Sequence, residues 1–315
     1  PNTWHKMLDI LLFWSSKGVD GFRCDMAEMV PAEFWGWATN RVKSKYSNII
    51  FIGEVYNPSE YRNYISNGFD YLYDKVGMYD TMRAATCGQC NTSAITHAWQ
   101  ANDDIRSHML YFLENHDEQR VASTFFAGEG KKGIPAFVAS VLMQQNPFML
   151  YAGEEYGESG MDKEGFSGLD GRTTIFDYWS IDTLCRATWN TLNEDEKNLY
   201  ELHQKVLRIA NKEQSICNGA FFDLMYANNH LDKQYVFIRR YEGAMLLIAV
   251  NFDTRDVCIG VNIPEHAFNF LNLEEVKVQA TDLLTNKKKT YELKKDSPIA
   301  IQLGASGAVV MKMKC

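Results

Sequence analysis

The stretch GVDGFRCDMAEMVP, from Gly18 to Pro31, places two opposite charges at the end of an apolar run. The run reaches Phe22, and Arg23 and Asp25 follow it, two residues apart. Side chains two residues apart on a strand point to the same face, so the guanidinium and the carboxylate should meet. A buried strand that ends in this way predicts either a structural ion pair or a functional site at its carboxyl end.

The residues around this strand alternate between strand and helix patterns. We expect helices over residues 2–18, 31–46, 58–68, 92–108 and 133–146, with Gly18 as the stop of the first and Pro31 in the first turn of the second. Buried strands are expected over residues 19–25, 48–55, 69–74, 109–117 and 147–155. Strands that alternate with helices of this length are typical of repeated βαβ units and a parallel sheet.

The pattern changes in the second half of the chain. Residues 155–193 are rich in Gly, Asp and aromatic residues and predict a long functional loop, and residues 193–212 predict an amphipathic helix. After about residue 214, β-rich segments are separated by Asn, Gly and Asp turns (221–227, 234–241, 245–252, 257–263 and 307–313). This favours two domains, 1–213 and 214–315, the second an antiparallel, sandwich-like β-domain.

Composition narrows the classes of protein. The 315 residues are 46% hydrophobic, enough for a sizeable core and about two domains. The net charge of −8, with no basic run longer than Lys287–Lys289, speaks against a nucleic-acid partner. No apolar stretch approaches the length of a membrane span. No signal peptide is visible, but Pro1 is not a natural start, so an upstream signal and the compartment stay open.

The seven cysteines carry little functional information. Cys87 and Cys90 form one C-x-x-C, and no second pair completes a zinc site. Ordinary thiols, a local disulfide and a metal site are the three alternatives for this pair.

Three acids stand where three of the predicted strands end. These are Asp25, Glu54 and Asp117, and parallel α/β proteins place their chemistry at such ends. Asp25 and Glu54 are one βαβ unit apart, which predicts neighbouring strands ~4.8 Å apart. That spacing is close to the ~5–5.5 Å between the two carboxyl groups of a retaining glycosidase.

The two roles in such an enzyme ask for different environments. A carboxylate nucleophile must stay ionised, and Arg23 would hold Asp25 charged. Glu54 should be protonated at rest, so we expect burial and the neighbouring carboxylate to raise its pKa. Taken singly, Arg23 with Asp25 is also compatible with a structural ion pair, and Asn115 to Asp117 with a helix cap. The order and spacing of all three acids favour the catalytic interpretation.

The same residues carry a family likeness. GFRCD (21–25), FIGE (51–54) and ENHD (114–117) resemble the second, third and fourth sequence regions of the α-amylase superfamily, glycoside hydrolase family 13. PFMLYAGEEYG (147–157) resembles the segment on that family's last barrel strand. The likeness extends over roughly residues 1–212, and the β-rich tail resembles the family's C-terminal domain.

The resemblance implies a (β/α)8 TIM-type barrel that acts on α-glucosidic bonds with retention, without a redox or organic cofactor. By position, Asp25 matches the nucleophile, Glu54 the acid/base and Asp117 the transition-state stabiliser. Arg23 matches a nucleophile-supporting position, and His116, with Asn115 beside it, a sugar-contacting one. The expected substrate is an α-glucan or a maltooligosaccharide.

Two departures from the family pattern matter. Glu28 and Met29 stand where many members carry a Lys-His pair, which counts against an endo-amylase subsite and against a calcium site sharing that loop. Calcium elsewhere in the complete enzyme stays open as an alternative. The family's first region is not in this sequence, so the chain is expected to supply about strands four to eight of the barrel. The open edges should then be covered by another chain or by the rest of a longer polypeptide.

Further substrate contacts are expected in YLYDKVGMYD (71–80) and DGRTTIFDYW (170–179), which mix aromatic rings with hydrogen-bonding groups. Tyr73, Asp74 and Arg172 are the candidates. Alternative functions are an α-glucan transglycosylase or a trehalose-synthase-type isomerase with the same three acids, and a catalytically silent carbohydrate-binding fragment.

Overall fold

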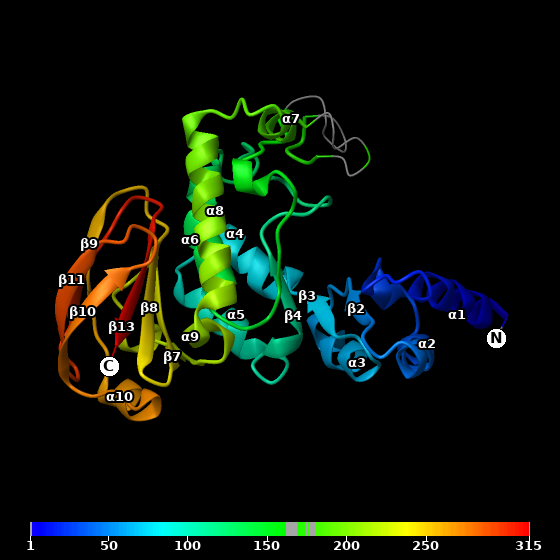
Figure 1. Cartoon of the computed structure of the whole chain (residues 1–315), viewed down its shortest axis with the longest axis horizontal. Helices are drawn as coiled ribbons and strands as arrows, with labels where there is room; N and C mark the ends of the chain where they lie inside the picture. Colours follow the sequence, from blue (N-terminus) through cyan, green and yellow to red (C-terminus); the bar gives the residue numbers. More distant parts are fainter. Residues whose placement is uncertain (1, 162–168, 174–175, 177–180, 315) are drawn as a thin grey trace. The chain divides into compact units, whose positions relative to one another are not determined.

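The computed structural model describes residues 2–161, 169–173, 176 and 181–314 (Figure 1). The chain divides into two compact units. Unit 1 comprises Pro1–Asp80 and Trp99–Tyr111, and unit 2 comprises Thr81–Ala98 and Phe112–Cys315. Among the described residues, no helix is both long and apolar enough to cross a lipid bilayer.

Unit 1 is built on short parallel strands. They are β1 (Gly21–Cys24), β2 (Ile50–Gly53), β3 (Tyr71–Tyr73) and β4 (Met109–Phe112), and they neighbour one another in that order. Each lies inside a stretch that the sequence predicted as a buried strand, so those predictions are confirmed, with shorter bounds. The register pairs Cys24 with Gly53 and Gly53 with Leu72. The residues that follow β1 and β2, Asp25 and Glu54, are therefore neighbours.

Gly53 is needed where β2 ends. A Cβ built on this residue would come within 2.8 Å of both the Leu72 side chain and the Phe69 ring. Such contacts are too short for any side chain, so only glycine lets β2 approach β3 and Phe69 this closely. The tight packing fixes the strand end from which Glu54 projects.

Two helices of unit 1 pack on each other through aromatic rings. α1 (Asn2–Ser15) contacts α2 (Ala32–Lys45), and the Trp4 ring lies 5.5 Å from Phe34 and 5.7 Å from Trp37 (Figure 1). Gly18 follows α1 with a positive φ of 85°, which confirms its predicted role as a stop. Pro31 precedes α2 as its N-cap and is not in its first turn, a one-residue correction.

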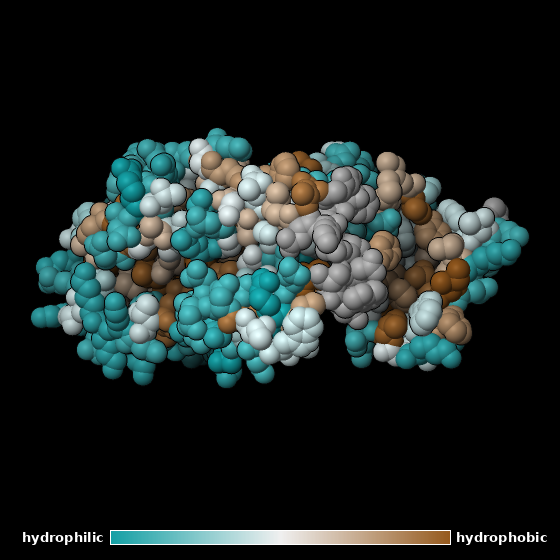
Figure 2. Space-filling view, turned by 90° about the horizontal axis from the view of Figure 1, so that it is seen from above, coloured by the Kyte–Doolittle hydropathy of each residue, from teal (hydrophilic) through white to brown (hydrophobic). Residues whose placement is uncertain are grey.

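The outer face of α1 is apolar and exposed. Its large hydrophobic side chains are between 43% and 53% exposed (Met7, Ile10, Phe13 and Trp14). Brown, hydrophobic surface is visible over this end of the chain in Figure 2. The expectation that another chain, or more of the same polypeptide, covers exposed apolar surface of the partial barrel stays a prediction.

Several predicted helices are shorter than expected or divided. Residues 58–68 form a 3-10 turn, Pro58–Glu60, followed by α3 (Tyr61–Ser66), and residues 92–108 form α5 (Ser93–Ala101) and a 3-10 turn, Arg106–His108. A π-helical turn, Lys75–Tyr79, and α4 (Asp80–Thr86) were not predicted. The carboxylate of Asp74 starts this segment, because it accepts a hydrogen bond from the Met78 N–H at 2.8 Å.

Between residues 134 and 212, the described part of unit 2 contains longer helices and a very short strand. α6 (Ile134–Leu142) is buried from Pro135 onward. Of the strand predicted over residues 147–155, only β5 (Phe148–Met149) forms. α8 (Glu194–Lys212) begins with a capping box in which Asn193 and Glu196 bond reciprocally. The prediction that residues 155–193 form a loop is wrong for part of this segment, because it contains α7 (Asp182–Thr188).

The rest of unit 2 is β-rich, as predicted. One antiparallel sheet has the order β11-β10-β13-β8-β7-β6, and β12 pairs with β9. The bounds are β6 Ala220–Asp223, β7 Gln234–Tyr241, β8 Ala244–Asn251, β9 Val257–Val261, β10 Val276–Asp282, β11 Lys288–Leu293, β12 Ile299–Leu303 and β13 Ala308–Lys314, with short helices α9 (Gln214–Cys217) and α10 (Glu265–Leu271). The predicted boundary between residues 213 and 214 falls inside this compact unit and stays a prediction.

Candidate active site

The carboxyl ends of β1 and β2 bring Asp25 and Glu54 together. The backbone N–H of Glu54 donates to the carbonyl of Cys24 at 3.0 Å, and the N–H of Ala27 donates to the carbonyl of Glu54 at 3.0 Å. The sheet therefore continues for one residue past each strand. This confirms that the two acids lie side by side, as the spacing of one βαβ unit predicted.

Arg23 joins the two acids. Its Nη1 is bonded to Asp25 Oδ1, and its Nη2 lies 3.1 Å from Glu54 Oε2. The guanidinium also lies over the Tyr73 ring, 5.6 Å from its centroid. Burial acts to lower the pKa of Arg23, but hydrogen bonds to Tyr73 and Asp25 and the charge of Glu54 outweigh it, so this pKa is raised. The guanidinium therefore stays charged, and it lies between the two carboxyl groups.

The two acids differ in exposure. The Asp25 side chain is 70% exposed, whereas that of Glu54 is 9% exposed. Glu54 Oε2 also accepts the Met26 N–H at 2.8 Å. Met26 adopts a left-handed conformation, with φ 43° and ψ 44°, which is rare for a residue with a side chain. A strained turn directly after Asp25 thus presents its N–H to the buried acid.

Sequence reasoning missed the structural role of Glu28. Its Oε2 accepts the N–H groups of Tyr56 and Asn57, at 3.1 and 3.0 Å, and so holds the segment that follows Glu54. A small cavity of about 100 Å³ is lined by Met26, Glu28, Met29, Glu54 and Tyr56. The one signal in the sequence was a carboxylate three residues after Asp25, where the family pattern has a cation.

Removing the Glu28 carboxylate should loosen this segment. We expect Glu28→Ala to lower the free energy of unfolding by about 1–2 kcal/mol, because two backbone N–H groups lose their acceptor. Glu28→Gln keeps an acceptor oxygen and should lose less. Urea denaturation of both variants, beside Asp9→Ala on the exposed side of α1 as a control, measures this. Equal stability of Glu28→Ala and the control would contradict it.

Two other predicted contacts in unit 1 are buried. Tyr73 is 4% exposed and packs under Arg23, and Asp74 is 1% exposed. Burial raises the pKa of Asp74 to about 6. Because Asp74 caps the turn that follows β3, its contacts favour a structural role over direct contact with sugar. The assignment of both residues to the substrate site stays a prediction.

In unit 2, Asn115, His116 and Asp117 form a turn directly after β4. Asn115 Oδ1 accepts the N–H groups of Asp117 and Glu118, at 2.8 and 2.9 Å. The buried Asn115 side chain therefore shapes a turn, and because no described helix begins at residues 115–117, the helix cap considered as an alternative is not what forms. His116 Nε2 lies 3.1 Å from Asp117 Oδ2, and the Asp117 side chain is 43% exposed. The tip of the turn therefore presents an imidazole and a carboxylate to solvent.

Sequence reasoning also missed a buried ion pair beside this turn. Arg120 Nη1 lies 2.7 Å from Glu114 Oε2, and the two side chains are 0% and 1% exposed. Glu154 is buried too, and burial together with the Glu114 charge raises its pKa well above the ordinary value. A Glu and an Arg on either side of Asn-His-Asp, in the run MLYFLENHDEQRV, were the available signal.

Arg172, the third predicted contact outside the sequence regions, is partly buried and paired. Its Nη2 lies 2.7 Å from Asp170 Oδ2, and its Nε donates to the same oxygen at 2.9 Å. Residues 174–175 and 177–179 of the predicted sugar-contacting segment lie outside the described residues.

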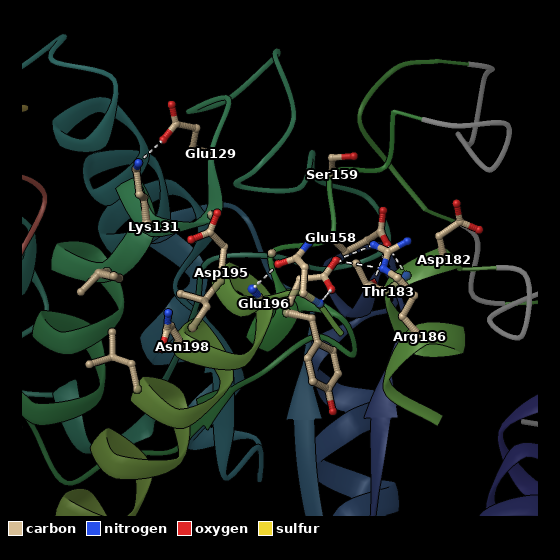
Figure 3. Close-up of a pocket in the computed structure, with 17 residues that line it drawn as sticks. Glu129, Lys131, Glu158, Ser159, Asp182, Thr183, Arg186, Asp195, Glu196 and Asn198 are labelled. Carbon is tan, nitrogen blue, oxygen red and sulfur yellow. Dashed lines mark hydrogen bonds and ion pairs between the residues drawn. The ribbon is translucent and has the colours of Figure 1, made fainter. Parts of the chain in front are cut away.

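A separate cavity of about 880 Å³ opens in unit 2 (Figure 3). α8 supplies Asp195, Glu196 and Asn198, while Thr183 and Arg186 come from α7. Many of its charges are already paired: Thr183 Oγ1 donates to Glu158 Oε2 at 2.6 Å, and Arg186 lies 2.6 Å from Glu196. None of the predicted site residues lines this cavity.

The cysteine pair has free thiols. Cys87 and Cys90 are both unbridged, and their Sγ atoms lie 3.4 and 3.9 Å from the carbonyls of Phe126 and Thr81. Burial raises the pKa of both thiols. Of the three alternatives for this pair, ordinary thiols are the one that the structure supports.

Comparisons with known proteins all match enzymes of one type. The family model described as "Alpha amylase, catalytic domain" matches residues 1–233. The chain is 24% identical over 336 residues to Alpha-amylase 3 of Dictyoglomus thermophilum, covering 99% of this chain and 62% of that protein. It is 22% identical over 284 residues to Neopullulanase 2 of Thermoactinomyces vulgaris, covering 84% of this chain and 42% of the relative.

A solved structure has the same fold. The maltogenic α-amylase AmyB of Thermotoga neapolitana superposes with a TM-score of 0.72 at 19% identity, over 99% of this chain and 66% of that one. This supports a TIM-barrel-like α/β fold with a sheet-rich C-terminal part. The chain thus spans about 62% and 42% of the lengths of the two curated relatives. Because the family model matches well over half of its residues, the chain belongs to the α-amylase catalytic-domain family.

Proposed function

We propose that the protein carrying this chain is a retaining glycoside hydrolase that acts on α-glucosidic bonds of starch-like glucans or maltooligosaccharides. The observation that carries the proposal is the pair of acids at neighbouring strand ends, Asp25 and Glu54, joined by the single guanidinium of Arg23. Retaining glycosidases need two carboxyl groups ~5–5.5 Å apart, one to attack and one to move a proton, and two acids on neighbouring strand ends suit that separation. Membership of the family supports the substrate class.

The first step assigns different work to the two acids. An Asp25 oxygen attacks the anomeric carbon while the bond to the leaving glucosyl oxygen breaks, and Glu54 gives its proton to that oxygen. Asp25 suits attack because its side chain is exposed and its carboxylate is bonded to the Arg23 guanidinium. Glu54 is buried and its Oε2 is bonded to Arg23 and Met26, which leaves Oε1 as the oxygen that transfers the proton in this proposal.

The second step reverses the proton's direction. Water gives a proton to Glu54 and attacks the anomeric carbon, and the bond to Asp25 breaks, so that both carboxyl groups return to their starting state. Asp117 is proposed to stabilise the positive charge that develops on the sugar, and His116 and Arg172 to bind its hydroxyl groups. No metal or organic cofactor is part of this proposal.

The stereochemistry of the product tests the proposal. We expect the full-length protein to release reducing sugar from maltoheptaose with the α-anomer formed first, because two displacements at the same carbon retain its configuration. Proton NMR during the first minutes of reaction measures the anomer. The β-anomer would indicate one displacement and would contradict the covalent intermediate.

Product analysis on maltoheptaose and, in a second reaction, on maltose separates the alternatives. A sugar that replaces water as the acceptor would give oligosaccharides longer than maltoheptaose, the mark of a transglycosylase. Conversion of maltose to a non-reducing disaccharide would indicate an isomerase. A full-length protein that binds maltoheptaose without changing it would be a carbohydrate-binding protein, and the hydrolase proposal would be wrong.

A further inference from the structure

We propose that Arg120 is a positioning residue for this reaction. Its buried guanidinium fixes both the turn that carries His116 and Asp117 and the segment that carries Arg172. The proposal rests on the function proposed above, because it assigns Arg120 a part in that site.

Burial of this ion pair calls for an explanation. Arg120 and Glu114 are completely enclosed in unit 2. Removing two such charges from water costs several kcal/mol for each ion, and their attraction offsets this only when the geometry and further hydrogen bonds are good. Apolar side chains of similar volume are often at least as stabilising. A fully buried pair is therefore better explained by the geometry that it imposes on its surroundings.

The first element that the pair fixes is the turn after β4. Glu114 Oε2 binds Arg120 Nη1 at 2.7 Å, and Glu114 Oε1 accepts the Val121 N–H at 2.6 Å. These bonds tie the two ends of the segment 114–121 to each other. Asn115 Oδ1, inside the turn, binds the N–H of Asp117. The backbone of Asp117 is thus fixed by Asn115, while its side chain remains accessible to a substrate.

The second element is the segment that carries Arg172. The backbone N–H of Arg120 donates to the carbonyl of Gly171 at 2.6 Å. Arg120 Nε and Nη2 both donate to Thr173 Oγ1, at 3.0 and 2.7 Å. Arg120 therefore holds the residues on both sides of Arg172.

A third contact sets the plane of the guanidinium. Nη2 donates to the carbonyl of Ala152 at 2.8 Å, and the group lies 4.0 Å from the centroid of the Tyr151 ring. Three segments that are distant in sequence thus meet on one planar cation. A lysine carries the same charge but lacks the fork of N–H groups and the flat face, so it cannot hold all three.

The test compares two buried arginines in the full-length protein. We expect Arg120→Lys to lower kcat on maltoheptaose by about 100-fold with a smaller change in KM, because a displacement of about 1 Å at a catalytic group costs about that much. The control is Arg239→Lys. Arg239 is 2% exposed and donates to the carbonyls of Ser215, Met143, Ile216 and Gly219, away from the turn.

The control should lower the melting temperature and leave kcat per folded molecule unchanged, with the folded fraction measured by near-UV circular dichroism. Equal losses of kcat in the two variants, or a kcat within twofold of wild type in Arg120→Lys, would overturn the proposal.

A milder pair of variants covers the case in which Arg120→Lys does not fold. Thr173 is 1% exposed, and its hydroxyl is the acceptor for two N–H groups of Arg120. Thr173→Val removes the acceptor at almost constant volume, and we expect a loss of about tenfold in kcat. Thr173→Ser restores the hydroxyl and should restore kcat to within about twofold of wild type. Equal activity of the two variants would contradict the role of Arg120.

Amide hydrogen exchange without substrate separates this proposal from the proposed function. If the wild-type protein does not act on α-glucans, the proposed function fails, and the exchange data then decide on Arg120. Faster exchange confined to residues 114–121 and 170–173 in Arg120→Lys, and not seen in Arg239→Lys, supports the positioning role. Unchanged exchange there, or faster exchange throughout unit 2, overturns it.

Discussion

Replacing Asp25 with asparagine is expected to lower kcat on maltooligosaccharides by at least about 10³-fold, because the amide oxygen is a poor nucleophile and no covalent intermediate can form. The fold should survive. The Asp25 side chain is 70% exposed, and the loss of such an ion pair with Arg23 changes the free energy of unfolding by about 1 kcal/mol or less. Steady-state release of reducing sugar by the full-length protein measures the loss of turnover.

The matched control for this variant is Asp20→Asn. Asp20 is exposed, lies just before β1 in the same unit and receives the same chemical change. Its kcat should stay within about twofold of wild type. Near-native turnover in Asp25→Asn would remove Asp25 from the role of nucleophile, whatever the family pattern.

The second large effect is expected from Glu54→Gln. An amide cannot give a proton to the leaving oxygen, so kcat on maltoheptaose should fall by about 10²–10⁴-fold. The loss should be much smaller for the first step on a maltosyl fluoride, because fluoride leaves without a proton. The amide oxygen can still accept the Met26 N–H, so the buried site keeps one of its bonds.

The comparison of the two substrates is the decisive measurement. The covalent intermediate should accumulate with the fluoride, because its breakdown also needs Glu54, and mass spectrometry of the intact variant would detect the added maltosyl group. Glu33→Gln, on the exposed first turn of α2, is the control. Equal losses on both substrates would show that Glu54 does not protonate the leaving group.

The sequence predicted the parts of the fold that depend on local pattern. Buried apolar runs located β1 to β4, and the amphipathic period of residues 193–212 located α8. It missed β10, β11 and β12, because exposed residues alternate with the buried ones and only two or three residues of each strand are buried. The π-helical turn after β3 could not be predicted, since it depends on the Asp74 carboxylate reaching the Met78 N–H.

The same distinction between local pattern and contacts in space applies to the candidate site. The spacing of one βαβ unit was enough to place Asp25 beside Glu54, because parallel strands share a register. That Arg23 would contact both acids, and that Glu28 would hold Tyr56 and Asn57, depends on how two turns meet in space. Arg120 and Glu114 were missed because no local rule says that charged residues beside an apolar strand will be buried together.

The left-handed backbone of Met26 has a consequence for attempts to engineer this protein. A side chain in that conformation costs of order 1 kcal/mol, and glycine or asparagine would tolerate the same φ and ψ with less strain. A library selected for heat resistance would therefore be expected to enrich glycine or asparagine at this position. Glycine would also make this turn more flexible, so the backbone N–H of residue 26 would be bonded to Glu54 for less of the time. The variants that survive heating best would therefore turn over more slowly. Directed evolution of this chain should for that reason screen turnover and thermal tolerance together.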